Sequence, residues 1–496
     1  MAKLVIIGGG IAGLSAGIFA QKNGFASMIL EKNHVLGGEC TGWDRQGYHI
    51  DGCIHWLVGT KKGTPIHELW TSVGALDGVE IYHQESFLTF EHASGAAVHL
   101  YRDLERLKSS WLELSPQDAE AIDDFCQAIE QLQSYEIPVE KPRDLLGPLE
   151  KVKLMMAMKD AGLIMRKFGK MSLKEYAKTF KHPALRETLA SFLPDGYSAS
   201  SVFFALAAFT KGQASIPYGG SKKFAQRMAE RYLSLGGRIE TSCEAIGLHK
   251  EGSKVSGVIC SNGQTFAADY FIAACDAHVL YERLLKGKYP DPDFQKRYNN
   301  PTDYPLGSEI HIAIGYEGTM EEIPRTLRFP VAPFKVNETT IDYLTITHYS
   351  YEPDFAPAGC TLLICSINQF PADYDQWHAL AEDPGSYRRE KSRVGEEVIR
   401  AIAMRFPQMQ GKLSLLDVAT PKTFERYCNA YRGAFMSFLP TVSGTMMSHT
   451  GRIKGLQNLF LSGQWLQPPG GLPVALITGK DTIMRLCKIK KQPFIG

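Results

Sequence analysis

Lys3-Leu4-Val5-Ile6-Ile7-Gly8-Gly9-Gly10-Ile11-Ala12-Gly13 joins an apolar strand to a Gly-x-Gly-x-x-Gly turn. This pattern is typical of a βαβ unit that binds a dinucleotide. Gly8 permits the tight turn from strand to helix, Gly10 lets a pyrophosphate approach the backbone, and Gly13 lets the helix pack closely on the strand. Ile11 and Ala12 begin that helix, and its positive N-terminus would receive the pyrophosphate.

Glu31 supports this interpretation because it follows a second apolar strand, Ala26-Ser27-Met28-Ile29-Leu30. A carboxylate at this place accepts hydrogen bonds from the ribose hydroxyls and repels a 2′-phosphate. We group Lys32, the next residue, with the same site. The alternative is a glycine-rich turn without a ligand, which the acid at this distance disfavours.

The composition is that of a large globular protein, since 44% of the 496 residues are hydrophobic and 22% are charged. The formal net charge of +1 gives no overall field that would attract nucleic acid. The ten cysteines form no Cys-x-x-Cys pair or zinc-like spacing, so we expect no metal and a cytoplasmic location. No apolar run reaches the length of about 18 residues that spans a membrane, and the N-terminal run is too short for a signal peptide.

A glycine pair, Gly37-Gly38, follows the ribose-binding acid, and an aromatic-rich segment from Gly47 to Trp56 comes after it. Bare backbone at Gly37-Gly38 lets a second part of a long cofactor pass. A nicotinamide-binding domain does not usually need this feature. We therefore expect FAD rather than NAD.

A third motif lies near the C-terminus, where Gly463-Gln464-Trp465 and then Pro468-Pro469-Gly470-Gly471-Leu472 precede a predicted helix over 474–487. A helix N-terminus carries about half a positive charge. Aimed at the pyrimidine edge of a flavin, it would stabilise the negative charge of the reduced ring by about 0.3–1 kcal/mol. We predict cofactor contacts from Gly463, Gln464, Gly471 and Leu472.

The order of these motifs resembles the phytoene desaturase, carotenoid isomerase and retinol saturase group of flavoproteins, relatives of the flavin amine oxidases. The likeness continues through Gly219-Gly220-Ser221 and Val255-Ser256-Gly257-Val258. It implies an α/β fold of the glutathione reductase and amine oxidase type, with a discontinuous Rossmann-like FAD-binding domain and an inserted α+β substrate domain. In the family the position matching Ile246 contacts adenine through its backbone, and we expect the same contact here. The alternative for Ile246 is a plain buried strand residue.

Two departures from the family pattern stand out. Glu39 follows Gly37-Gly38 where the family often has arginine, and Gln464 follows Gly463 where it often has aspartate. Glu39 cannot supply the missing cation, and a carboxylate near a pyrophosphate is unfavourable unless it turns away. Gln464 can still hydrogen-bond the ribityl chain.

The segments between the motifs divide the chain into two predicted domains. Residues 1–70, 215–285 and 421–496 would form the FAD-binding domain, and 71–214 and 286–420 a substrate domain with a helical cap. The periodicity predicts helices over 107–114, 119–137, 151–168, 173–180 and 387–406, and strands over 308–315, 343–349 and 361–368. Alternating strands over 238–241, 245–249, 254–260 and 265–266 predict a small meander that feeds a core strand over 270–274.

Residues 151–170 hold six cations, one acid and four methionines. This composition suits an interfacial helix or the entrance of a hydrophobic tunnel, which makes a peripheral membrane contact an expectation for this segment. The alternative is a helix packed on its neighbours with a solvated basic face.

Chemistry at a flavin needs little from the protein beyond alignment of a C–H bond, so we assign no catalytic residue. We expect His55, Trp56 and Trp465 to face the substrate, with His55 or His49 as a proton-handling group. A buried structural histidine is the alternative for His55. We interpret Asp276 and His278 as turn and helix-capping residues rather than as an acid and a base.

We therefore predict an FAD-dependent oxidoreductase that desaturates, saturates or isomerises an apolar, polyene or isoprenoid, small molecule. The first alternative is a flavin amine oxidase, in which Trp56 and Trp465 would form an aromatic cage around a neutral amine. The second is a non-catalytic prenyl or lipid carrier similar to the Rab GDP-dissociation inhibitors. The intact glycines and Glu31 argue against the carrier.

Overall fold

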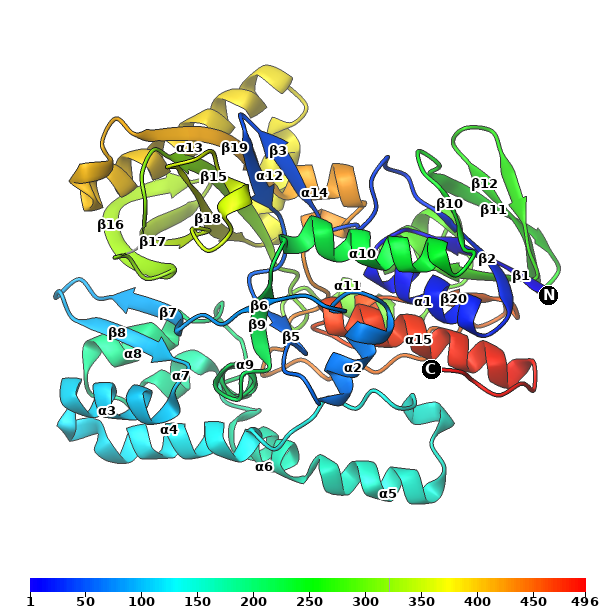
Figure 1. Ribbon diagram of the computed structural model, residues 1–496, viewed down its shortest axis with the longest axis horizontal. Helices are drawn as coiled ribbons and strands as arrows, with labels where there is room; N and C mark the ends of the chain where they lie inside the picture. The colour runs from blue at the N-terminus through cyan, green and yellow to red at the C-terminus, as the bar shows by residue number, and fades with distance from the viewer. Residues whose placement is uncertain (321) are drawn as a thin grey trace.

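The computed structural model describes residues 1–320 and 322–496, and its centre is a five-stranded parallel sheet (Figure 1). The strand order is β10-β2-β1-β14-β20. Both faces of such a sheet are covered, which explains the nearly continuous apolar runs. Its strands are β1 (Ala2–Ile7), β2 (Phe25–Leu30), β10 (Arg238–Glu240), β14 (Tyr270–Ala273) and β20 (Leu459–Leu461).

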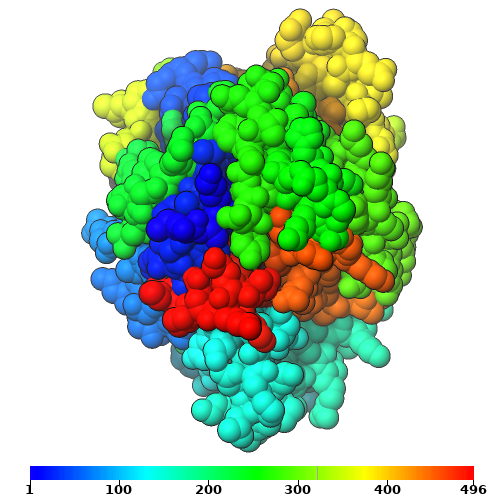
Figure 2. Space-filling model, turned by 90° about the vertical axis from the view of Figure 1, so that its right-hand side faces the viewer, coloured from blue at the N-terminus to red at the C-terminus, as the bar shows by residue number. Residues whose placement is uncertain are grey.

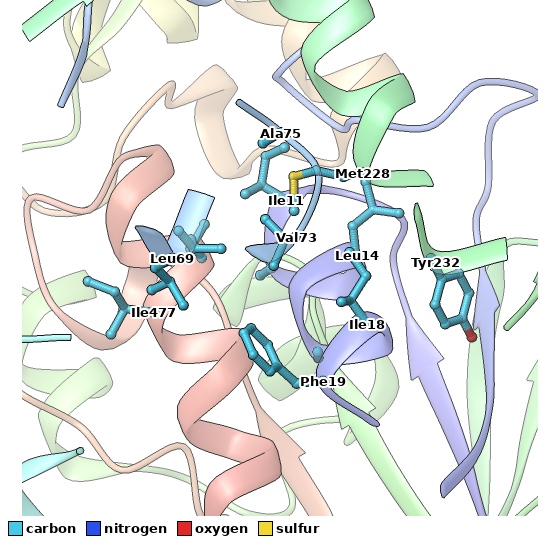
Figure 3. Close-up of a cluster of buried hydrophobic side chains, with 14 of the residues drawn as sticks. Ile11, Leu14, Ile18, Phe19, Leu69, Val73, Ala75, Met228, Tyr232 and Ile477 are labelled. Atoms are coloured by element: carbon cyan, nitrogen blue, oxygen red, sulfur yellow. The ribbon is translucent and has the colours of Figure 1, made fainter. Parts of the chain in front are cut away.

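The first helix, α1 (Ile11–Lys22), is buried along almost its whole length. Figure 3 shows Ile11, Leu14, Ile18 and Phe19 of α1 among side chains of three other helices. These helices are α2 (Pro65–Ser72), α10 (Gly220–Ser234) and α15 (Leu472–Ile489), which contribute Leu69, Met228, Tyr232 and Ile477 to the cluster. The motifs at the two ends of the chain are therefore packed together.

A second, seven-stranded sheet has the order β19-β15-β18-β17-β16-β7-β8. One face packs on two helices, and Ile310, Ile312 and Ile314 of β15 lie in that core with Trp377 and Val398. Because side chains alternate along a strand, Glu309 and His311 point to the opposite face. The elements are β7 (Ser86–Glu91), β8 (Ala97–Tyr101), β15 (Ser308–Tyr316), β16 (Thr326–Val336), β17 (Thr339–His348), β18 (Thr361–Gln369), β19 (Leu413–Ala419), α12 (Pro371–Leu380) and α13 (Pro384–Arg405).

A layer of helices lies at the other end of the molecule from α12 and α13 (Figure 1). Trp111, Phe125, Phe180 and Phe203 form much of its core, which also includes Phe90 of β7. The helices are α3 (Leu104–Leu114), α4 (Ala119–Leu132), α5 (Pro148–Ala157), α6 (Lys159–Phe168), α7 (Leu173–Ala177), α8 (Pro183–Ala190) and α9 (Ser200–Thr210). This layer corresponds to the predicted helical cap.

The prediction of one helix over 151–168 is wrong, because the chain breaks at Met158 into α5 and α6. Ala161, Ile164 and Phe168 of α6 recur at helical spacing and are buried in the cap core. Helix α5 has no buried residue, so it leaves the cap and projects from it. Figure 2 shows the part of the chain that contains these helices (cyan) extending below the C-terminal helix (red).

The prediction that residues 238–241 belong to the meander is also wrong. Strand β10 pairs in parallel with β2, with Arg238 opposite Met28, and so forms the edge of the central sheet. The meander has three strands, β11 (Ala245–Glu251), β12 (Lys254–Cys260) and β13 (Thr265–Ala267). The remaining elements are the hairpin β3 (Gly42–Arg45) and β4 (Tyr48–Asp51), the sheet β5 (Leu57–Val58), β9 (Ala214–Pro217) and β6 (Ile81–Tyr82), and helices α11 (Pro292–Tyr298) and α14 (Pro421–Cys428).

The parallel sheet takes its strands from the three segments predicted for the FAD-binding domain, and the seven-stranded sheet takes its strands from the two segments predicted for the substrate domain. The exact domain limits stay a prediction. Within the described residues, no helix has both the length and the apolarity needed to cross a membrane.

Gly13 is one of the positions where the fold leaves no room for a side chain. A Cβ there would lie 2.0 Å from the carbonyl oxygen of Gly8, so Gly13→Ala must push α1 away from β1. We expect a loss of about 1–3 kcal/mol in the free energy of unfolding, measured by urea denaturation, together with loss of bound flavin. Gly162→Ala in α6 is the control, since its Cβ meets nothing within 4 Å, and it should be neutral or slightly stabilising. Equal effects of the two changes would contradict this account.

Candidate functional site

The glycine motifs at residues 8–13 and 37–38 lie against each other. The Gly37 amide donates a hydrogen bond of 2.9 Å to the Gly9 carbonyl oxygen, and Gly10 and Gly37 form an isolated parallel bridge. A Cβ added to Gly38 would stand 3.4 Å from the Gly10 Cα, and Gly38 has φ +62°. Two stretches of bare backbone therefore form one wall of a cleft, as a pyrophosphate requires.

Glu31 lies at the end of β2 and is buried. Its Oε2 accepts a hydrogen bond of 2.8 Å from the Gly9 amide, and its Oε1 accepts one of 2.8 Å from the Asn33 amide. These bonds fix the carboxylate beside the glycine turn, where the ribose is predicted. Lys32 points elsewhere, because its Nζ donates to the Arg426 carbonyl oxygen and to Asn429 Oδ1, both at 2.8 Å.

Helix α15 brings the C-terminal motif to the same cleft. Ser15 of α1 donates a hydrogen bond of 2.7 Å to the Leu476 carbonyl oxygen of α15, and the Gly463 amide donates one of 3.0 Å to Thr478 Oγ1. Gly471, the N-cap of α15, has its amide 3.0 Å from Gln464 Oε1. Leu472, the first residue of α15, is therefore held next to Gln464.

The cleft fits a long dinucleotide. The N-cap of α1 is Gly10, with no side-chain cap and no acid in the first turn, so its first amides are available to a phosphate. A Cβ on Gly463 would meet only Ala12 Cβ, at 4.0 Å, which leaves open space along the cleft. The glycine turn, Glu31 and the N-terminus of α15 thus stay the predicted contacts for the two ends of an FAD molecule.

His55 and Trp56 lie just before β5, and both side chains are only partly buried. Burial lowers the pKa of the His55 imidazole, which keeps the ring neutral near pH 7. Trp56 packs edge-on against Phe87, with 5.4 Å between ring centroids. Phe192 and Phe209 extend this aromatic group from the cap.

Trp465 and His49 lie elsewhere. Trp465 is 4% exposed and packs on Tyr298 and Phe438, in a core on the other side of the central sheet. It therefore does not pair with Trp56, and the aromatic cage predicted for an amine oxidase is not formed by these two residues. His49 Nδ1 is 2.7 Å from Asp44 Oδ1 on the β3–β4 hairpin, which gives it a structural partner.

The capping role predicted for Asp276 is confirmed. Its carboxylate accepts hydrogen bonds from the amides of His278, at 2.7 Å, and Tyr431, at 2.8 Å. Ile246 is half exposed on β11. In the same segment it is Cys243 whose amide donates to the Glu31 carbonyl oxygen, at 2.8 Å. The adenine contact of Ile246 stays a prediction.

Several polar residues beside His55 were not predicted. His311 of β15 is fully buried, its Nδ1 is 3.3 Å from Glu309 Oε1, and its ring centroid is 6.4 Å from that of His55. The pKa of the buried Glu309 is nevertheless lowered, because His311 hydrogen-bonds and attracts the charged form. The polar residues within an otherwise apolar strand, Glu309 and His311, were the signal in the sequence.

A family model described as flavin containing amine oxidoreductase matches residues 11–483. The chain belongs to this family. It is accordingly an FAD-dependent oxidoreductase. The residues described above are its candidate FAD site, and their contacts with the cofactor stay a prediction. The family assignment favours an enzyme over the non-catalytic carrier.

The curated relatives include carotenoid enzymes that match nearly the whole chain. A 1-hydroxycarotenoid 3,4-desaturase of Flavobacterium sp. strain P99-3 is 22% identical, over 97% of this chain and 98% of the relative. A lycopene-forming phytoene desaturase of Pseudescherichia vulneris is 23% identical, over 97% and 98%. A chloroplastic prolycopene isomerase of Daucus carota is 23% identical, over 87% and 71%.

Solved structures support the fold. Putrescine oxidase bound to putrescine is similar, with a TM-score of 0.60, 15% identity, and coverage of 98% of this chain and 99% of that one. Cyclohexylamine oxidase from Brevibacterium oxydans IH-35A has a TM-score of 0.56 at 14% identity, with coverage of 99% and 100%. The α/β architecture of a flavin amine oxidase is thereby confirmed.

The two departures from the family pattern contact each other. Gln464 Nε2 donates a hydrogen bond of 3.3 Å to Glu39 Oε2. Burial, and next the neighbouring Asp276, raise the pKa of Glu39 to about 8. Among the described residues, no cation forms an ion pair with Glu39. Glu39 is thus neutral near pH 7 and can donate a hydrogen bond, which removes its conflict with a pyrophosphate.

The raised pKa of Glu39 predicts a pH dependence of FAD binding. As the pH rises through about 8, Glu39 ionises and repels the pyrophosphate, so the dissociation constant of FAD should rise up to about tenfold between about pH 7 and about pH 9. Titration of the apoprotein with FAD, followed by quenching of flavin fluorescence, measures this change.

Glu39→Gln is the matched variant, because its amide keeps the size and the donor but cannot ionise. We expect its FAD affinity to change much less over this range. Asp276, whose pKa is raised to about 7 by burial, is unaltered in the variant and accounts for any dependence that remains. Identical pH profiles for the two proteins would rule out the role of Glu39.

Proposed function

We propose that this enzyme desaturates, saturates or isomerises a carbon–carbon double bond in an elongated apolar substrate of the polyene or isoprenoid class. The main support is that relatives named as carotenoid desaturases and a prolycopene isomerase match the substrate-domain segments as well as the FAD motifs. The aromatic group of Trp56, Phe87, Phe192 and Phe209 offers an apolar wall for such a chain, beside His55.

Bound FAD would supply the electron chemistry, by exchanging a hydride with a substrate carbon. The residues of this chain hold and orient the substrate and handle a proton. The imidazole of His55 has no side-chain hydrogen bond to any described residue, so both ring nitrogens are open to the interior. Because its pKa is lowered by burial, the neutral ring can accept or return a proton at a substrate carbon.

The amine oxidase alternative rests on the description of the family and on the fold. The similar amine oxidase structures are 14–15% identical. Trp56 and Trp465 lie in separate aromatic groups, so they provide no cage for a neutral amine. A polyene-type substrate fits the observations better.

The proposal is tested with the purified flavoprotein under anaerobic conditions. Reduced flavin is mixed with polyenes and unsaturated lipids, oxidised flavin is mixed with the same compounds and with amines, and visible absorbance and product analysis follow the outcome. Reoxidation by an alkene supports saturation, reduction by a polyene precursor supports desaturation, and interconversion of isomers with reduced flavin alone supports isomerisation. Reduction by amines but not by any alkene would overturn the proposal.

His55→Gln tests the proton-handling role. With the reactive compound found in that panel, we expect the rate of flavin reduction or reoxidation to fall by about a hundredfold or more. Flavin content, read from visible absorbance, should be unchanged. His49→Gln is the matched control, because His49 is paired with Asp44 on a hairpin, and its rate should stay within about twofold of the wild type. Equal rates for all three proteins would exclude His55.

We further propose that helix α5 and the start of α6 dock on an anionic membrane, from which an apolar substrate is taken up. Leu149, Met155 and Met156 of α5 are 80%, 68% and 69% exposed. An open groove of about 710 Å³ lies between the two helices, and its lining includes Met155, Met156 and Met158 together with Lys151 and Lys159. Exposed apolar side chains flanked by lysines suit the interface of a negatively charged bilayer.

Docking is measured by co-sedimentation with vesicles that contain phosphatidylglycerol. Met155→Glu combined with Met156→Glu should abolish binding, because it places charge where acyl chains would contact the helix. Met404→Glu in α13 is the control, since this methionine is 66% exposed on the helix pair at the opposite end of the molecule. Binding by the double variant at the wild-type level would refute the docking surface.

A further inference from the structure

Arg325 is a buried cation at the junction of the two sheets. It precedes β16, is 9% exposed, and lies against two tyrosines. Its Cζ is 5.7 Å from the ring centroid of Tyr349 and 5.2 Å from that of Tyr351. Tyr351 in turn stacks on Tyr82 at 4.2 Å, so the guanidinium ends in an aromatic wall rather than in solvent.

Two nitrogen atoms of the Arg325 guanidinium have no hydrogen-bond partner among the described residues. Nη1 makes a long hydrogen bond of 3.4 Å to Thr326 Oγ1, whereas Nε and Nη2 are buried and have no such partner in the part of the chain that the structure describes. No described carboxylate lies within ion-pair distance of Arg325. A buried charge without a partner is strongly unfavourable, and the tyrosine faces offset only part of that cost.

The atoms without partners around Arg325 form a group rich in donors. Tyr349 OH and Asp51 Oδ2 are both buried and unpaired. Burial raises the pKa of Asp51, which favours the protonated form that can donate from Oδ2. Other charged or titratable groups that the structure describes near this place include His55, which interacts with Asp51 and Arg325, and His348, which interacts with Arg325. Glu309 is also near and is hydrogen-bonded to His311. Donors therefore outnumber free acceptors, and the missing component is an acceptor.

We propose that Arg325, together with Tyr349, binds a carboxylate group of the substrate. Nε and Nη2 form the side of a guanidinium that grips the two oxygens of a carboxylate in parallel, and the tyrosine hydroxyl can donate to the same group. This proposal rests on the proposed function and narrows its substrate class to an unsaturated apolar chain that ends in a carboxylic acid.

The surroundings of His55 match both ends of such a molecule. Trp56, the next residue along the chain, packs on Phe87 and suits the apolar chain. Arg325 and His311 also lie near His55, and a pure hydrocarbon would leave Nε and Nη2 of Arg325 and Nε2 of His311 without partners. Both His55 and Tyr351 keep some solvent-accessible surface.

The test is a binding experiment on the oxidised holoenzyme, without turnover. Linoleic acid and linoleyl alcohol share one chain and differ in the head group. Titration is followed by the visible spectrum of the flavin and by tryptophan fluorescence. We expect the wild type to bind the acid at least about tenfold more tightly than the alcohol, because the carboxylate forms charge-assisted hydrogen bonds with the Arg325 nitrogens and the alcohol does not.

Arg325→Gln should bring the ratio of the two affinities close to one and leave the affinity for the alcohol nearly unchanged. Arg325→Lys should keep part of the preference, since it retains the charge but not the paired donors. Arg297→Gln is the matched control, because Arg297 is a guanidinium that is 3% exposed and lies away from this site. A variant that merely unfolds would lose flavin and weaken both ligands equally.

Three outcomes would overturn the proposal: equal affinities of the wild type for acid and alcohol, failure of the wild type to bind the acid, or an acid preference that persists in Arg325→Gln. Binding is measured without reaction. A preference for the acid in a protein that converts no alkene would therefore refute the proposed function and leave the carboxylate site standing.

Discussion

The close approach of α1 to its neighbours is the constraint on which the rest of the structure depends. A Cβ on Gly13 would collide with the carbonyl of Gly8, and a Cβ on Gly479 would lie 2.6 Å from the Ala12 carbonyl oxygen. Only glycine at both positions lets α1 touch β1 and α15 at the same time. This contact brings residues from the two ends of the chain together, as the cluster shared by side chains of α1 and α15 shows (Figure 3).

The parts of the site that could be predicted from the sequence are those whose signal is local. A strand, a glycine turn and an acid lie within the first 31 residues, so the position of Glu31 followed from spacing alone. The break between α5 and α6 could not be predicted in that way, because methionines and lysines continue through Met158 without a turn residue. Only packing distinguishes the two helices, since the cap offers an apolar surface to α6 and none to α5.

The polar group around His55 was beyond prediction for a different reason. This group comes from three places in the seven-stranded sheet: His311 lies in β15, Arg325 just before β16 and Tyr349 just after β17. These residues lie near His55 and Asp51 only because the sheet packs on the cofactor-binding half of the molecule. In the sequence, Arg325 and Tyr349 look like ordinary residues of a strand or a turn, and the polar pair Glu309 and His311 marks its strand without indicating what it faces. Their unpaired atoms become informative only when burial is known, because an exposed guanidinium or hydroxyl would bond to water.

The same reasoning changes the meaning of the two departures from the family pattern. Considered separately, Glu39 lacks the expected cation and Gln464 lacks the expected carboxylate. In the structure they form one hydrogen-bonded unit, in which Gln464 links Glu39 to the amide that caps α15. Because burial and the neighbouring Asp276 favour the neutral form of Glu39, this unit brings no negative charge to a pyrophosphate near pH 7. The site becomes sensitive to pH with this pair of side chains, since Glu39 ionises as the pH rises through about 8.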